Sequence, residues 1–149
     1  MQTRAKTKMA VEYIRFERTV NLLLLVALKD LPAGTKLTLD GHPEQFVEMS
    51  QILEVPKPGP MQKKLRHDGA FSQPDAVITF PYDDRKMPIV IDAKHYTTDV
   101  SAGTIRKTLD DMALRDTPFG LLVCSEIAGL SSYNFMIQTQ LDGASQQST

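Results

Sequence analysis

The chain has little thiol chemistry and no long apolar run. Its only cysteine, Cys124, excludes an intramolecular disulfide, and nothing in the sequence indicates an oxidising compartment. The longest wholly apolar run, from Leu22 to Leu28, is far shorter than the roughly 20 residues that a membrane-spanning helix needs. The basic N-terminus has no apolar core followed by a cleavage site. We therefore expect no signal peptide, no membrane partner and an intracellular location, either cytoplasmic or in the nucleoid or nucleus.

Several familiar catalytic arrangements are missing from the sequence as well. It shows no glycine-rich phosphate loop and no Ser-His-Asp arrangement. The three histidines, His42, His67 and His95, do not combine with Cys124 in the spacing of a tetrahedral zinc site. The chemistry of this chain, if it has one, must come from other residue types.

What is present is an ordinary globular composition, with 42% apolar and 23% charged residues in 149. That length predicts one domain over residues 1–149, with flexible ends at 1–8 and 138–149. The net charge of −1 does not indicate a polyanion binder, but residues 1–30 are basic and residues 75–99 are acidic. This asymmetry suits a protein that contacts phosphates with one part and a cation with another, although a solvated basic terminus is an equal alternative.

A long helix is predicted over residues 9–30, where apolar residues recur at helical spacing: Phe16, Val20, Leu23 and Ala27. Its second half is apolar all round, which predicts burial against a sheet. Glu17 projects from a mostly apolar side of this helix. A buried carboxylate needs a cation or a metal site, unless Glu17 stays partly exposed and is held by Arg15 or Arg18.

The remaining pattern predicts an α/β fold with a mixed central sheet flanked by helices. A short strand is expected at 35–40 and a short helix at 43–55, where a strand is the alternative. Two central strands, 75–80 and 89–96, are joined by a turn at 81–86, and the segment 61–73 turns near Gly69. A helix at 104–115 and a strand at 120–125 follow. The core face of that helix is predicted to carry Ile105, Leu109, Met112 and Ala113, and Lys107 is spaced for a surface pair with Asp111.

Two acids and a lysine stand out on the central strands. Because side chains alternate along a strand, Asp92 and Lys94 share one face, and Asp75 opens the neighbouring strand. Carboxylates brought together in this way are hard ligands that suit Mg²⁺ or Mn²⁺. Lys94 would hold an attacking water or neutralise charge that develops on a phosphate.

These residues resemble the signature of the PD-(D/E)xK nuclease superfamily. Pro74-Asp75 is separated by sixteen residues from Asp92-Ala93-Lys94, and Phe16-Glu17 stands where that superfamily often carries an acid on the preceding helix. The resemblance covers about residues 9–126. It implies a restriction-endonuclease-like core in the order helix, three strands, helix, strand (αβββαβ).

The resemblance also implies a metal-dependent endonuclease that hydrolyses DNA. Asp75, Asp92, the Ala93 carbonyl and Glu17 would bind Mg²⁺ or Mn²⁺, and Lys94 would position or help deprotonate the water. An RNA-cleaving member of the superfamily and a degenerate nucleic-acid-binding protein are the alternatives. So small a chain would take its sequence specificity from a homodimer or a partner protein. Basic residues that could contact the nucleic acid are Lys63, Lys64, Arg66 and Lys107, although the first three could equally form a charged edge strand.

Overall fold

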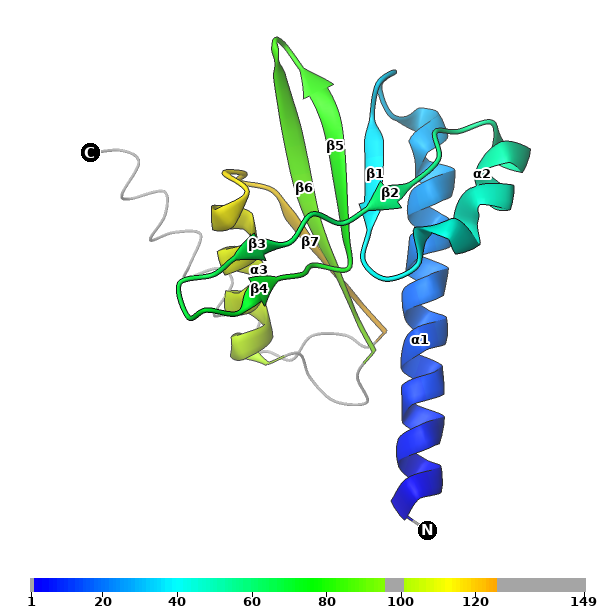
Figure 1. Ribbon diagram of the computed structural model, residues 1–149, viewed down its shortest axis with the longest axis vertical. Helices are drawn as coiled ribbons and strands as arrows, with labels where there is room; N and C mark the ends of the chain where they lie inside the picture. Colours follow the sequence, from blue (N-terminus) through cyan, green and yellow to red (C-terminus); the bar gives the residue numbers. More distant parts are fainter. Residues whose placement is uncertain (1, 96–100, 126–149) are drawn as a thin grey trace.

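The computed structural model describes residues 2–95 and 101–125, with side chains from Val11 onward. A five-stranded mixed sheet lies between helices α1 and α3 (Figure 1). In chain order the elements are α1 (Gln2–Ala27), η1 (Leu28–Asp30), β1 (Lys36–Leu39), η2 (Pro43–Phe46), α2 (Val47–Leu53), β2 (Gly59–Pro60), β3 (Lys64–Leu65), β4 (Phe71–Ser72), β5 (Ala76–Tyr82), β6 (Arg85–Lys94), α3 (Ala102–Leu114) and β7 (Gly120–Cys124). The predicted element 127–137 and the predicted flexible tail 138–149 lie outside the described residues.

The sheet has the order β2-β1-β5-β6-β7. Strand β5 runs antiparallel to both β1 and β6, while β7 runs parallel to β6 and β2 runs parallel to β1. Parallel neighbours need a crossover connection, and α3 supplies it between β6 and β7. The predicted mixed α/β architecture is therefore confirmed. Among the described elements, α1, β1, β5, β6, α3 and β7 also follow one another in the predicted order.

Helix α1 covers one face of the sheet with a different set of residues from the predicted one. Val20, Leu24, Leu25 and Leu28 are buried against sheet residues such as Ile78. Leu23 was expected in the core, but it is 63% exposed. The prediction failed because the run 22–28 contains no polar residue that would set the phase of the helix. The same run is not buried all round, since Leu22 and Val26 are exposed too.

The helix also begins earlier than predicted. Backbone residues 2–8 are already helical, whereas the sequence pattern predicted a loose segment there. Residues 43–55 form η2 and α2, so the helical prediction is confirmed and the strand alternative is wrong. No helix in the described part of the chain is both long and apolar enough to cross a membrane.

Helix α3 covers the opposite face and begins at Ala102, two residues before the predicted start at 104. The Ser101 hydroxyl accepts a hydrogen bond from the Thr104 N–H over 3.2 Å, which is an N-cap. Its buried residues are Ile105, Thr108 and Asp111, whereas Ala113, predicted for the core, is exposed. The predicted surface pair of Lys107 with Asp111 is wrong, because the Asp111 side chain is fully buried.

Two hairpins complete the fold. Strands β5 and β6 pair as far as Tyr82 and Arg85, so their loop holds only Asp83 and Asp84 and the turn predicted over 81–86 is too wide. In the segment 61–73, β3 and β4 pair across a turn that includes Gly69, as predicted. Gly69 has a φ of +85°, a left-handed conformation that favours glycine.

Candidate active site

The strand register brings Asp75 and Asp92 together. Ala76 pairs with Ile91, so one further step of the antiparallel register sets Asp75 opposite Asp92. The Asp75 N–H donates to Asp92 Oδ1 over 3.3 Å, and the N–H of the next residue on β6, Ala93, donates to Asp75 Oδ2 over 2.7 Å. The Asp40 N–H donates to the Asp75 carbonyl, which ties β1 to the same point. The predicted pair of carboxylates is thus held by the backbone of three strands.

Asp92 is almost completely buried, with 1% of its surface exposed. Its second oxygen, Oδ2, accepts a hydrogen bond from the Thr108 hydroxyl of α3 over 3.1 Å. A buried carboxylate is tolerated when donors surround it, and Thr108 with the Asp75 N–H supplies them. The sequence prediction missed Thr108. A signal was available, because Thr108 follows Ile105 by three residues on the buried side of α3.

Glu17 belongs to the same cluster, although it comes from α1. Burial and the neighbouring carboxylates of Asp75 and Asp40 raise the pKa of Glu17 to about 7, and the positive charge of Lys94 opposes that rise. A hydrogen bond between the side chains of Glu17 and Asp75 acts in the same direction as burial. The alternative in which Arg15 or Arg18 balances Glu17 is not what the structure shows, since both arginines are exposed and the opposing cation is Lys94.

The pKa of Asp75 is raised as well, mainly by burial and also by the charge of Asp92. The Ala93 N–H, Lys94 and Lys107 work against this rise. The positive charge of Lys107 therefore acts on the site from α3. The site thus holds three carboxylates, Glu17, Asp75 and Asp92, next to one lysine, Lys94, so acidic groups outnumber the nearest basic group.

On the side of β6 that faces α1, residues 93 and 95 make a second set of contacts. The Tyr13 hydroxyl donates to the Ala93 carbonyl over 3.3 Å, and Tyr13 precedes Glu17 by one helical turn. His95 packs on Phe16, with ring centroids 5.6 Å apart, and its Nε2 lies 3.7 Å from a Glu12 oxygen. Tyr13 is thus a further residue of the site that the sequence prediction missed, and its spacing from Glu17 was the signal. His95 is held locally by α1.

Family models, curated proteins and solved structures all fail to match this chain. Any functional assignment therefore rests on the residues of the site.

The donor set is compatible with a hard divalent cation. Within the described ranges, no three His, Cys, Asp or Glu side chains form a group that could hold a metal ion by themselves. The expected ligand set is broader, because it includes the Ala93 carbonyl beside Asp75 and Asp92, and Mg²⁺ commonly keeps several waters. Burial and, after it, the neighbouring carboxylates raise the pKa values of Glu17 and Asp75, and a bound cation would oppose both effects by favouring the charged carboxylates. The residues therefore fit Mg²⁺ or Mn²⁺.

The predicted basic residues Lys63, Lys64 and Arg66 lie just before β3, in β3 and in the turn that follows it, and Figure 1 shows this β3–β4 hairpin. Arg66 is paired with Asp68 across the turn, 3.1 Å apart, and Lys63 and Lys64 are exposed. His67 lies in the same turn and lines a cavity of about 410 Å³ with Asp110 and Leu114 of α3. The hairpin therefore presents its charge to solvent.

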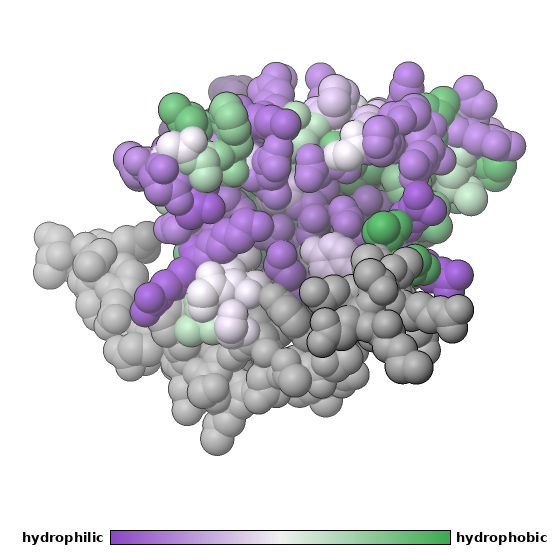
Figure 2. All heavy atoms as spheres, turned by 60° about the horizontal axis from the view of Figure 1, so that its bottom comes forward, coloured by the Kyte–Doolittle hydropathy of each residue, from purple (hydrophilic) through white to green (hydrophobic). Residues whose placement is uncertain are grey.

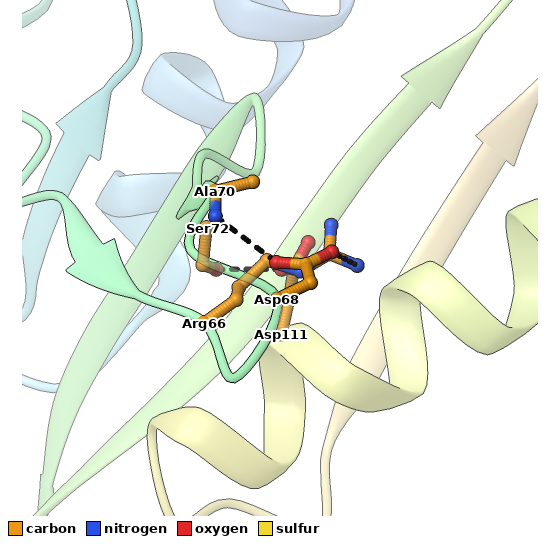
Figure 3. Close-up of polar contacts among 5 residues, drawn as sticks. All are labelled: Arg66, Asp68, Ala70, Ser72 and Asp111. Atoms are coloured by element: carbon orange, nitrogen blue, oxygen red, sulfur yellow. Dashed lines mark hydrogen bonds and ion pairs between the residues drawn. The ribbon is translucent and has the colours of Figure 1, made fainter.

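A buried polar network anchors this hairpin to α3 (Figure 3). The Ser72 hydroxyl donates to Asp111 Oδ1 over 2.5 Å and accepts from the Arg115 guanidinium over 2.7 Å. Asp111 also lies three residues after Thr108, which holds Asp92. One polar stripe on α3 thus fixes both Asp92 and the segment that leads into Asp75.

Proposed function

We propose that this chain is a divalent-metal-dependent endonuclease that hydrolyses DNA phosphodiester bonds, built on a restriction-endonuclease-like core. The observation that carries the proposal is the reciprocal bonding of Asp75 with Asp92 and Ala93, next to Lys94 on the same strand. In a view from the end of the sheet where β6 finishes, hydrophilic residues predominate among the coloured atoms (Figure 2).

Each residue has a distinct role in this proposal. Asp75, Asp92 and the Ala93 carbonyl hold the cation, and Glu17 completes the shell of ligands or bound water. Lys94 orients the attacking water and stabilises the negative charge that develops on the phosphate. The water oxygen forms a bond to phosphorus while the bond to the leaving sugar oxygen breaks. A bound Mg²⁺ or Mn²⁺ would supply electrostatic stabilisation of the phosphate and leaving-group oxygens.

Thr108 and Tyr13 hold two of the proposed metal ligands in place by hydrogen bonds. Thr108 holds Asp92 Oδ2, and Tyr13 contacts the Ala93 carbonyl from the opposite side of the strand. A catalytic constellation works only when such partners fix its geometry, so both residues are positioning residues here.

The test is cleavage of plasmid, single-stranded DNA and RNA with Mg²⁺, Mn²⁺ or EDTA. Asp75→Asn and Lys94→Met should each lower the rate by at least about 100-fold, as expected when a metal ligand or an acid–base group is lost. Matched controls exist on the same two strands: Asp83→Asn and Lys86→Met change exposed residues near the far turn and should cleave like wild type.

The substrates that are cleaved decide among the alternatives. Cleavage of RNA alone would assign the chain to the RNA-cleaving class. If no substrate is cleaved in any metal, or if the two site variants match their controls, the enzyme assignment fails and a nucleic-acid-binding role remains.

A further inference from the structure

The β3–β4 hairpin exposes an apolar pair. Leu65 and Phe71 are directly opposite each other in the register, and they are 63% and 57% exposed. The other pair of the hairpin, Lys64 with Ser72, lies on the α3 side, where Lys64 Nζ approaches the Leu114 carbonyl at 3.5 Å. Because side chains alternate along a strand, Leu65 and Phe71 point away from α3.

The same hairpin is fixed firmly at its base. Burial of Asp111 is unfavourable unless donors compensate, and Ser72 supplies one hydrogen bond to it. The turn is closed by Asp68, whose Oδ1 accepts from the Ala70 N–H over 3.0 Å and whose Oδ2 pairs with Arg66 (Figure 3). An isolated two-stranded hairpin is marginally stable, so these anchors hold an exposed phenyl ring in a defined place.

The charge around this ring favours an anionic ligand. Lys63 and Lys64 are exposed next to Leu65, and the one acid of the segment 61–73, Asp68, is already paired with Arg66. Only Gln73 and Pro74 separate β4 from Asp75, so the hairpin base adjoins the candidate active site. An aromatic ring beside lysines is the combination that binds single-stranded nucleic acids, where bases stack on the ring and lysines contact phosphates.

We propose that the hairpin 63–72 binds an unpaired stretch of nucleic acid, with Phe71 and Leu65 against a base and Lys63, which alternation places on the side of Leu65, on its phosphates. For cleavage, the inference rests on the nuclease function proposed above, but binding is measurable without it. A single strand is favoured over a duplex because its base faces are open. Insertion of one phenyl ring into a duplex requires unstacking, which other proteins offset by wrapping bent DNA over a large surface.

The experiment is fluorescence anisotropy with a labelled single strand of about 15 nucleotides and the matching duplex, in EDTA so that no cleavage occurs. Wild type should prefer the single strand, and Phe71→Ala should weaken that binding about tenfold, as expected for the loss of one stacked base. Tyr82→Ala is the matched control, because Tyr82 is 59% exposed at the other hairpin. Lys63→Ala should lower the slope of log K against log salt by about 0.7, the value for one phosphate contact.

A second variant reads the contact directly. The chain contains no tryptophan, so Phe71→Trp introduces a single reporter at the exposed position. Its emission should be quenched by the single strand and much less by the duplex. Unchanged emission, or equal binding by wild type, Phe71→Ala and Tyr82→Ala, would overturn the proposal. So would a dimer in light scattering that Phe71→Ala dissociates without any change in nucleic-acid affinity, because a second copy would then be the occupant.

Binding and cleavage separate the two proposals. Phe71-dependent binding without cleavage in Mg²⁺ or Mn²⁺ supports the hairpin and refutes the nuclease. Cleavage that depends on Asp75 but not on Phe71, with unchanged affinity, supports the nuclease and refutes the hairpin.

Discussion

Replacement of Thr108 by valine should destabilise the protein through Asp92. The two side chains have nearly the same shape, so the change removes a hydroxyl without opening a cavity. That hydroxyl has one proton to donate, and two acceptors lie within reach of it: Asp92 Oδ2 at 3.1 Å and the Thr104 carbonyl at 3.3 Å. A hydrogen bond to a charged group contributes about 1.5–3 kcal/mol, and here the acceptor is buried.

Thr19→Val is the matched control. Thr19 also lies on a helix, and its hydroxyl donates to the Arg15 carbonyl one turn earlier, but it is exposed and contacts no carboxylate. That variant should stay within about 0.5 kcal/mol of wild type. The difference between the two variants therefore isolates the bond to Asp92.

The assay is chemical denaturation, with thermal melting in parallel. A loss of about 1.5–3 kcal/mol corresponds to a fall in Tm of about 3–12 °C for a chain of this length. In an Asp92→Asn background the penalty of Thr108→Val should shrink, because the acceptor has lost its charge. Equal losses for Thr108→Val and Thr19→Val would refute the reasoning, since the bond to Asp92 would then contribute nothing.

Three further predictions concern the same site. Because the pKa of Glu17 is raised to about 7, the folded protein binds this proton more tightly than the unfolded chain, and the contribution of Glu17 to stability falls as the pH rises from about 4.5 to 7. The difference in unfolding free energy between wild type and Glu17→Gln should change by about 1–2 kcal/mol over that range, after solvent screening is allowed for. A difference that does not vary with pH would contradict this prediction. Mg²⁺ must displace that proton, so its stabilising effect in thermal melts should be larger at pH 8 than at pH 6, and it should vanish in Asp75→Asn. Ser72→Ala leaves buried Asp111 Oδ1 without a hydrogen bond, so urea titration should show a loss of about 1.5–3 kcal/mol, against about 1 kcal/mol for the exposed cap variant Ser101→Ala.

The sequence was most informative on the strands, where polar residues interrupt a regular two-residue alternation of side chains. The alternation of side chains on the two central strands predicted that Asp75 and Asp92 lie together, and the two-residue loop between β5 and β6 sets the register that brings them opposite.

The sequence was least informative where a contact spans the fold. Thr108 and Tyr13 reach strand β6 from α3 and α1, and the helical spacing that places each of them does not identify its partner on the strand. Asp111 looked like a surface acid because its compensating partner, Ser72, comes from β4. The buried face of α1 was predicted wrongly for a different reason. In an unbroken apolar run Leu23 and Leu24 have the same pattern around them, and only the position of the sheet determines which of the two is buried.

The two outer strands of the sheet differ in their capacity to recruit another strand. β2 is two residues long and ends in Pro60, which has no N–H to donate, so that edge offers almost nothing to pair with. Within the described sheet, β7 is the opposite edge, with five residues and an exposed Leu121 after the exposed Phe119. Among the described strands, β7 is therefore the edge with backbone groups to offer another strand, and it lies next to the strand that carries Asp92 and Lys94.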